Sequence, residues 1–224
     1  MDISPTQHTV VIPPTEKHTA SVIFVHGLGQ NTFTWRAMIL EGLVPRLPHV
    51  EWILPQASDK PVTYSRARRP SWFNIATLPP GHDEYDEPAI ADSIGVIESL
   101  ILSQIHRGID SRKIILVGFS QGAALSLMVA LSTLHDLGGV ASLSGWIPPR
   151  ARDQTIASPN IPILWCHGLD DEEIPIGVGE NAVEYLREHL RDTVQFKTYP
   201  GLKHTINDNE VDDLLGWIIE RTTR

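Results

Sequence analysis

Short apolar runs and longer segments with helical spacing alternate along the sequence. The runs are rich in β-branched residues and indicate buried strands, whereas apolar residues recurring every three or four positions indicate helices with one buried face. The expected strands are 22–25, 52–54, 114–117, 140–143, 161–166 and 194–199, with an edge strand at 9–12. The expected helices are about 34–46, 88–107, 121–134, 179–190 and 209–221. This order predicts an α/β fold with a mostly parallel central sheet and helices on both faces.

The segment 55–88 departs from this alternation, because it has many prolines and no sustained period. It is too long for an ordinary connection, and loops of this length are usually functional or disordered. Since it contains Trp72 and Phe73, we expect an ordered flap over a site. The length of 224 residues suits a single domain spanning 1–224.

Charge and composition exclude some classes of function. The net charge of −9 argues against a nucleic-acid partner, because phosphate contacts need clustered Lys and Arg. The densest basic stretch is Arg66, Arg68 and Arg69, which we interpret as solvated loop surface.

Other features of the sequence bear on where in the cell the protein is located. Cys166 is the only cysteine, so no intrachain disulfide can form, as is typical of reducing compartments. Residues 1–18 contain no apolar run and are not expected to be a signal peptide. No stretch is expected to span a membrane. We therefore expect a cytoplasmic protein, with at most transient contact with membrane surfaces, as a monomer or homodimer.

The motif with the clearest chemistry is G-x-S-x-G at 118–122, centred on Ser120. The expected strand 114–117 precedes it and an expected helix follows it, which is the context that the motif requires. Such a turn exposes the serine hydroxyl above the sheet, and its glycines avoid collisions with neighbouring elements. The alternative is a serine that only caps the helix.

A serine hydroxyl needs a base to become an effective nucleophile. In a nucleophile-elbow enzyme the chain order is Ser, then an acid, then His. Asp170 and Asp171 follow an expected strand, and His204 lies between the last strand and the last helix. Open α/β sheets build their sites at the carboxyl ends of strands. His204 is therefore the expected base, while the residues alone leave the two aspartates nearly even.

A glycine-flanked loop follows the strand 22–25 and can stabilise an oxyanion. We expect the backbone N–H groups of Leu28 and Gln121 to be its donors. His26 and His167 are expected to make structural hydrogen bonds, with a two-histidine metal site as the weaker alternative. Because no metal-ligand spacing such as H-E-x-x-H occurs, we expect no metal.

The sequence resembles the acyl-protein thioesterase and carboxylesterase family of α/β-hydrolases. The matching blocks, in order, are FVHGLG at 24–29, PSWF at 70–73, RKIIL at 112–116, GFSQG at 118–122, LSGWIP at 143–148, CHG at 166–168 and FKTY at 196–199 with His204. In that family the acid lies three residues after the glycine of His-Gly, which selects Asp171. The resemblance implies the α/β-hydrolase fold and a triad of Ser120, Asp171 and His204, with no cofactor.

The resemblance also implies hydrolysis of carboxylic thioesters or esters, including S-palmitoyl groups on proteins. The alternatives are a short-chain carboxylesterase or lysophospholipase without a protein substrate, and a hydrolase-like binding module that has lost turnover. Trp72, Leu78 and Trp146 are candidate walls of the acyl pocket, with plain core packing as the alternative. Glu172 and Glu173 replace the family's proline and apolar residue, so a shorter or more polar substrate is an open alternative.

Overall fold

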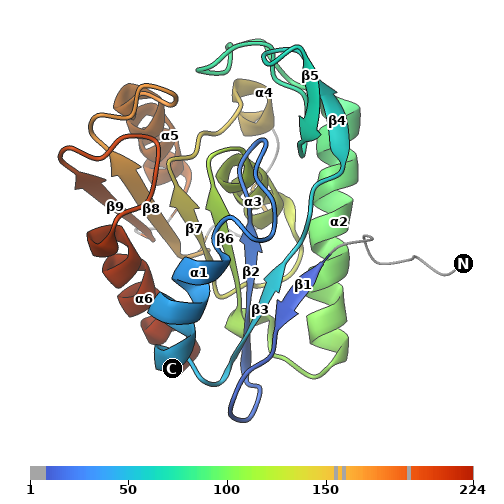
Figure 1. Cartoon of the computed structure of the whole chain (residues 1–224), viewed down its shortest axis with the longest axis vertical. Coiled ribbons are helices and arrows are strands. Elements are labelled where there is room, and N and C mark those ends of the chain that lie inside the picture. Colours follow the sequence, from blue (N-terminus) through green and yellow to red (C-terminus); the bar gives the residue numbers. More distant parts are fainter. Residues whose placement is uncertain (1–8, 154–155, 158–159, 191–192, 224) are drawn as a thin grey trace, which may run out of the picture.

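The computed structural model describes residues 9–153, 156–157, 160–190 and 193–223 (Figure 1). Residues 1–8 of the segment analysed for a signal peptide lie outside this part. Within it, seven strands form one sheet in the order β1-β3-β2-β6-β7-β8-β9. The strands are β1 (Val10–Ile12), β2 (Ala20–Val25), β3 (Val50–Leu54), β6 (Ile114–Phe119), β7 (Gly139–Leu143), β8 (Ile163–Gly168) and β9 (Val194–Tyr199). Only β1 runs antiparallel to its neighbour among these paired strands.

Helices cover both faces of this sheet, as the alternating sequence predicts (Figure 1). On one face lie α2 (Glu87–His106), α3 (Gln121–Ser132) and α5 (Ile176–His189), and on the other lie α1 (Arg36–Met38) and α6 (Asp208–Thr223). The side chains of β2 alternate between the faces, because Ile23 belongs to the first core cluster and Phe24 to the second. The expected fold class is confirmed.

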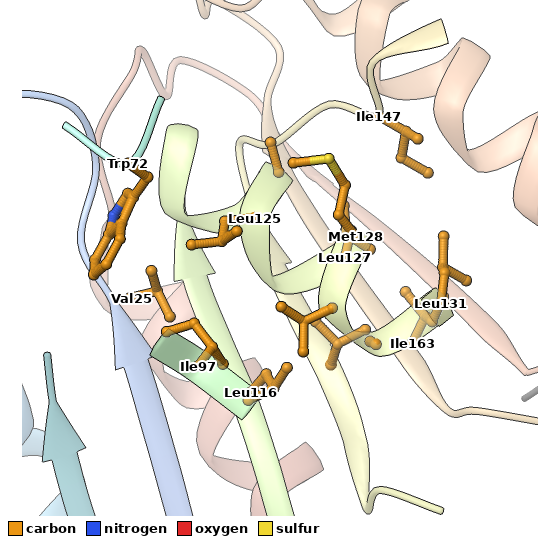
Figure 2. Close-up of a cluster of buried hydrophobic side chains, with 14 of the residues drawn as sticks. Val25, Trp72, Ile97, Leu116, Leu125, Leu127, Met128, Leu131, Ile147 and Ile163 are labelled. Carbon is orange, nitrogen blue, oxygen red and sulfur yellow. The ribbon is translucent and has the colours of Figure 1, made fainter. Parts of the chain in front are cut away.

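The first core cluster joins the central strands to α2 and α3 (Figure 2). Val25 of β2 and Leu116 of β6 lie near Ile97 of α2 and Leu125 of α3, and all four are buried. Nearly every residue of α3 is buried, so this helix is held firmly against the sheet. The turn between β6 and α3 therefore has a fixed position.

The segment 55–88, which was expected to form an ordered flap, contains a hairpin. Strand β4 (Asp59–Val62) pairs antiparallel with β5 (Ala67–Pro70) as a separate two-stranded sheet. The sequences DKPV and ARRP lack the alternation of polar and apolar residues that identifies a strand, so the hairpin was not predicted.

The helix expected at about 34–46 is divided into three short pieces. Helix α1 is followed by a π-helical turn (Ile39–Leu43) and a 3-10 turn (Val44–Arg46). Pro45 lies in the last turn and has no N–H to donate to the preceding turn, which explains why the regular helix does not continue to the end. Helix α4 (Pro149–Arg152) and a 3-10 turn (Ser111–Lys113) complete the helical elements of the described residues.

The sequence predicts no membrane span, but helix α2 has the length and hydropathy of one. Its 20 residues, with a mean hydropathy of 1.3, are long and apolar enough to cross a membrane. A helix that covers a sheet passes the same test, and α2 buries Ile90, Ile97 and Ile101 in the core.

Candidate active site

Ser120 occupies a sharp turn between β6 and α3. Its backbone has φ 53° and ψ −120°, a conformation that residues other than glycine rarely adopt. The flanking glycines are required by close contacts, since a Cβ on Gly122 would lie 2.1 Å from the carbonyl oxygen of Val25. A Cβ on Gly118 would lie 2.4 Å from the carbonyl oxygen of Gly122. The core therefore fixes where the Ser120 hydroxyl lies.

The imidazole of His204 connects Ser120 to Asp171. Nε2 of His204 lies 2.8 Å from Oγ of Ser120, and Nδ1 lies 2.7 Å from Oδ2 of Asp171. The three residues follow three different strands, β6, β8 and β9, at their carboxyl ends. Asp170 is exposed, and its N–H donates to the carbonyl oxygen of Leu202. Of the two candidate aspartates, the structure brings Asp171 to the imidazole.

The carboxylate of Asp171 is buried, and the oxygen that does not contact His204 accepts two hydrogen bonds. Oδ1 accepts from the backbone N–H groups of Glu173 at 3.0 Å and Ile174 at 2.8 Å. Burial by itself would raise the pKa of Asp171, but hydrogen bonds from His204 and from the N–H of Ile174 outweigh it and hold the pKa below its ordinary value. Asp171 is therefore ionised, and the proton between the two side chains stays on Nδ1 of His204.

The two other histidines near the site make structural contacts, as the sequence suggested. The ring of His167 donates from Nε2 to the carbonyl oxygen of Ile174 at 2.7 Å, which supports the loop that holds Asp171. Burial lowers the pKa of His26 to about 4, although its hydrogen bond to Gly27 acts in the opposite direction. Neutral His26 donates from Nδ1 to the Gly27 carbonyl and accepts from the N–H of Ala57 at Nε2, at 2.8 and 3.1 Å.

The expected oxyanion donors, Leu28 and Gln121, line the same pocket as Ser120. Gln121 is the first residue of α3, so its backbone N–H has no acceptor within the helix. Its side chain points elsewhere. Nε2 donates to the carbonyl of Phe73 at 2.7 Å, and Oε1 accepts from the N–H of Trp72 at 3.0 Å. The side chain thus ties the segment after β5 to α3, which the sequence did not indicate.

The pocket above Ser120 has a volume of about 470 Å³. Its lining residues are Gly27, Leu28, Gln30, Tyr64, Ser65, Arg69, Ile75, Leu78, Phe119, Ser120, Gln121, Trp146, Glu173 and His204. Of the three expected acyl-pocket walls, Leu78 and Trp146 are present. Trp72 is absent from the lining because it is buried and its indole N–H donates to the His26 carbonyl at 2.8 Å. For Trp72 the core-packing alternative describes its position.

Two charged residues of the lining matter for the substrate. Arg69 is exposed, as expected of solvated surface, and it also contributes to the pocket lining, as does Glu173 of the acidic pair. Glu173 lies close to the imidazole, with Oε2 3.8 Å from Nε2 of His204. Across the described ranges, no group of three or more His, Cys, Asp or Glu side chains has an arrangement that would hold a metal ion.

Comparison with known proteins gives matches over almost the whole chain. A family model described as Phospholipase/Carboxylesterase matches residues 6–220. Acyl-protein thioesterase 1 of Yarrowia lipolytica is 34% identical over 224 residues, covering 96% of this chain and 98% of that protein. Acyl-protein thioesterase 1 of Cryptococcus neoformans is 33% identical over 227 residues, covering 93% and 95%.

A solved structure agrees with these sequence matches. The crystal structure of Zea mays acyl-protein thioesterase 2 is similar with a TM-score of 0.84 at 29% identity, covering 96% of this chain and 99% of that one. The hydrogen-bonded series of Ser120, His204 and Asp171 has the geometry of serine esterases. The chain belongs to the phospholipase/carboxylesterase family and is a hydrolase of the serine-esterase type.

Proposed function

We propose that this protein hydrolyses acyl thioesters and esters through an acyl-enzyme on Ser120, and that S-acylated proteins are among its substrates. The observation that carries the proposal is the pair of hydrogen bonds at 2.8 and 2.7 Å that connects Ser120, His204 and Asp171 beside a pocket. The names of the relatives support the protein substrate, since they are acyl-protein thioesterases. We further propose that residues 1–224 act as one domain.

In the first half of the reaction, Nε2 of His204 removes the hydroxyl proton of Ser120 as Oγ attacks the carbonyl carbon. The carbonyl oxygen gains negative charge and accepts hydrogen bonds from the backbone N–H groups of Leu28 and Gln121. The tetrahedral intermediate collapses, the bond to the thiol or alcohol breaks, and His204 gives the proton to that leaving group. Asp171 stabilises the imidazolium while it exists.

In the second half, a water molecule replaces the leaving group. His204 removes a proton from this water as its oxygen attacks the acyl carbon, and it then gives that proton to Oγ of Ser120 as the acyl–oxygen bond breaks. The products are a carboxylic acid, a thiol or alcohol, and regenerated enzyme. Leu78 and Trp146 form apolar parts of the pocket wall, and we assign them to the acyl chain.

A fluorophosphonate probe tests the assignment of the nucleophile. Labelling is expected on wild-type protein, and the variant Ser120→Ala is expected to lose both labelling and about a millionfold in turnover. A folded wild type that is not labelled at Ser120 and hydrolyses nothing would favour the non-catalytic binding module, whereas labelling that persists in folded Ser120→Ala would show that the nucleophile is another residue. Since the proposed steps use only protein groups, chelation with EDTA is expected to leave the rate unchanged.

The substrate class is tested with an S-octanoyl cysteine peptide and a series of p-nitrophenyl esters from acetyl to dodecanoyl. A protein thioesterase is expected to cleave the peptide with a kcat/KM comparable to that for the best ester. Cleavage of short esters alone would support the short-chain carboxylesterase instead.

We propose a cytoplasmic enzyme that touches membranes only transiently and works as a monomer or homodimer. The single cysteine, Cys166, supports a reducing compartment, because it is buried and free. Cell fractionation and light scattering after size-exclusion chromatography test these points. Recovery in a membrane pellet after a carbonate wash would contradict transient contact.

A further inference from the structure

A carboxylate lies beside the atom that protonates the leaving group. Oε2 of Glu173 is 3.8 Å from Nε2 of His204, and the Glu173 side chain is 58% exposed. In the proposed reaction Nε2 transfers its proton to the departing thiol or alcohol. Glu173 therefore flanks the space through which the leaving half of the substrate must pass.

The backbone of Glu173 is held by the site itself. Its N–H donates to Oδ1 of Asp171 at 3.0 Å, and the next residue, Ile174, donates to the same oxygen. Ile174 also accepts a hydrogen bond from the ring of His167. The Cα of Glu173 thus has a fixed position relative to the imidazole, and only its side chain is free to adjust to a ligand.

A residue of opposite charge belongs to the lining of the same pocket. Arg69 lines the pocket, and its Cδ would lie 3.7 Å from a Cβ built on Gly29, in the loop that carries Leu28. In the parts of the chain described by the structure, the Arg69 guanidinium has neither an ion pair nor a hydrogen bond. A cationic group is repelled by Arg69 and attracted by Glu173, so the two charges favour the orientation of a charged substrate that places its cation at Glu173.

We propose that the leaving half of the substrate carries a positive charge near the scissile bond, and that Glu173 binds this charge. This inference rests on the function proposed above. For a protein thioester, the matching chemistry is an S-acylated cysteine flanked by lysine or arginine. Acidic leaving groups are disfavoured by the same carboxylate, and so Glu173 acts as a specificity-determining residue.

Two S-octanoyl cysteine peptides that differ only in flanking Lys or Glu residues test this proposal. The measured quantity is the ratio of kcat/KM for the Lys peptide to that for the Glu peptide, because effects common to both peptides cancel. Wild type is expected to prefer the Lys peptide about two- to fivefold, as for one partly exposed charge pair. Glu173→Gln is expected to bring the ratio near one, and Glu173→Lys to invert it. The wild-type ratio is expected to fall in high salt.

Glu172→Gln is the matched control, because Glu172 is exposed, carries the same charge and does not line the pocket. This variant is expected to keep the wild-type ratio. Equal cleavage of both peptides by wild type would overturn this inference alone, whereas cleavage of neither would overturn the proposed function with it. A ratio that Glu173→Gln leaves unchanged, or that Glu172→Gln abolishes equally, would contradict the assignment. The assignment would also be contradicted if the enzyme showed a charge preference only for esters that carry the cation at the end of the acyl chain.

Discussion

Nδ1 of His204 lies 2.7 Å from Oδ2 of Asp171, although 33 positions separate the two residues in the sequence. The second carboxylate oxygen is occupied by two backbone N–H groups, so the acid has one orientation available. The contact keeps a proton on Nδ1 and leaves the lone pair of Nε2 facing Ser120. This geometry distinguishes Asp171 from its neighbour Asp170.

Asp171→Asn is expected to lower kcat by about 10⁴-fold, because an amide favours the wrong imidazole tautomer. The matched variant Asp170→Asn is expected to stay within a few-fold of wild type, since Asp170 is exposed. Initial rates with p-nitrophenyl octanoate measure both effects, with circular dichroism to verify folding. If Asp170→Asn lost activity to the same extent, Asp171 would not be the acid.

Gly122→Ala is expected to prevent folding or to abolish activity, because its Cβ would lie 2.1 Å from the carbonyl oxygen of Val25. The atoms that this Cβ would meet belong to the backbone of Val25 and His26, so they cannot move aside cheaply. The control is Gly95→Ala in α2, where a Cβ meets nothing within 4 Å. That change is expected to raise the free energy of unfolding by about 0.5–1 kcal/mol. Urea denaturation and soluble yield are the measurements, and a stable, active Gly122→Ala protein would contradict the described turn.

Gln121→Ala is expected to lower the free energy of unfolding by about 1–3 kcal/mol. The change leaves the buried N–H of Trp72 without its acceptor and removes one of two donors to the Phe73 carbonyl, which keeps the hydroxyl of Ser71. Gln195→Ala, at an exposed position of β9, is expected to change stability by less than about 0.5 kcal/mol. Urea denaturation compares the two, and equal effects would show that the buried hydrogen bonds contribute little.

Glu210 of α6 gives the protein a pH-dependent stability. Burial raises its pKa to about 8, the charges of Asp171 and Asp213 act in the same direction, and the nearby backbone of Asn207 has a smaller, opposite effect. Neither carboxyl oxygen has a hydrogen-bond partner among the residues with described positions. The folded protein therefore keeps this proton up to about pH 8, whereas the unfolded chain releases it near the ordinary value of 4.5.

Between these two pKa values the folded state binds more protons, so stability falls as the pH rises from about 4.5 to about 8. Glu210→Gln removes this dependence. Its free energy of unfolding relative to wild type is expected to rise over that range, by as much as about 4 kcal/mol. Urea titrations at pH 5, 6, 7 and 8 measure the difference. A difference that stays constant with pH would show that Glu210 is ionised throughout.

Local sequence patterns were sufficient to predict the sheet, the helices that cover it and the turn that carries Ser120. Buried strands such as β6 consist of apolar residues, α2 repeats them at helical spacing, and G-x-S-x-G requires a strand before it and a helix after it. Each of these signals lies within one short window of the sequence. Chain order and the family resemblance then identified His204 and selected Asp171.

Other features depended on contacts between distant segments and could not be read from local patterns. The sequence alone did not show that the Gln121 side chain hydrogen-bonds to the segment after β5. It also did not show that the Trp72 indole donates to the His26 carbonyl, or that the Glu173 carboxylate lies beside the His204 imidazole. Without the family resemblance, the residues alone also left open which of the two adjacent aspartates faces the imidazole. Each depends on the direction of a side chain after the sheet has brought separate loops together. The sequence determined which elements form and in what order, whereas only the tertiary structure decided which side chains meet, because those contacts arise from the packing of the whole sheet.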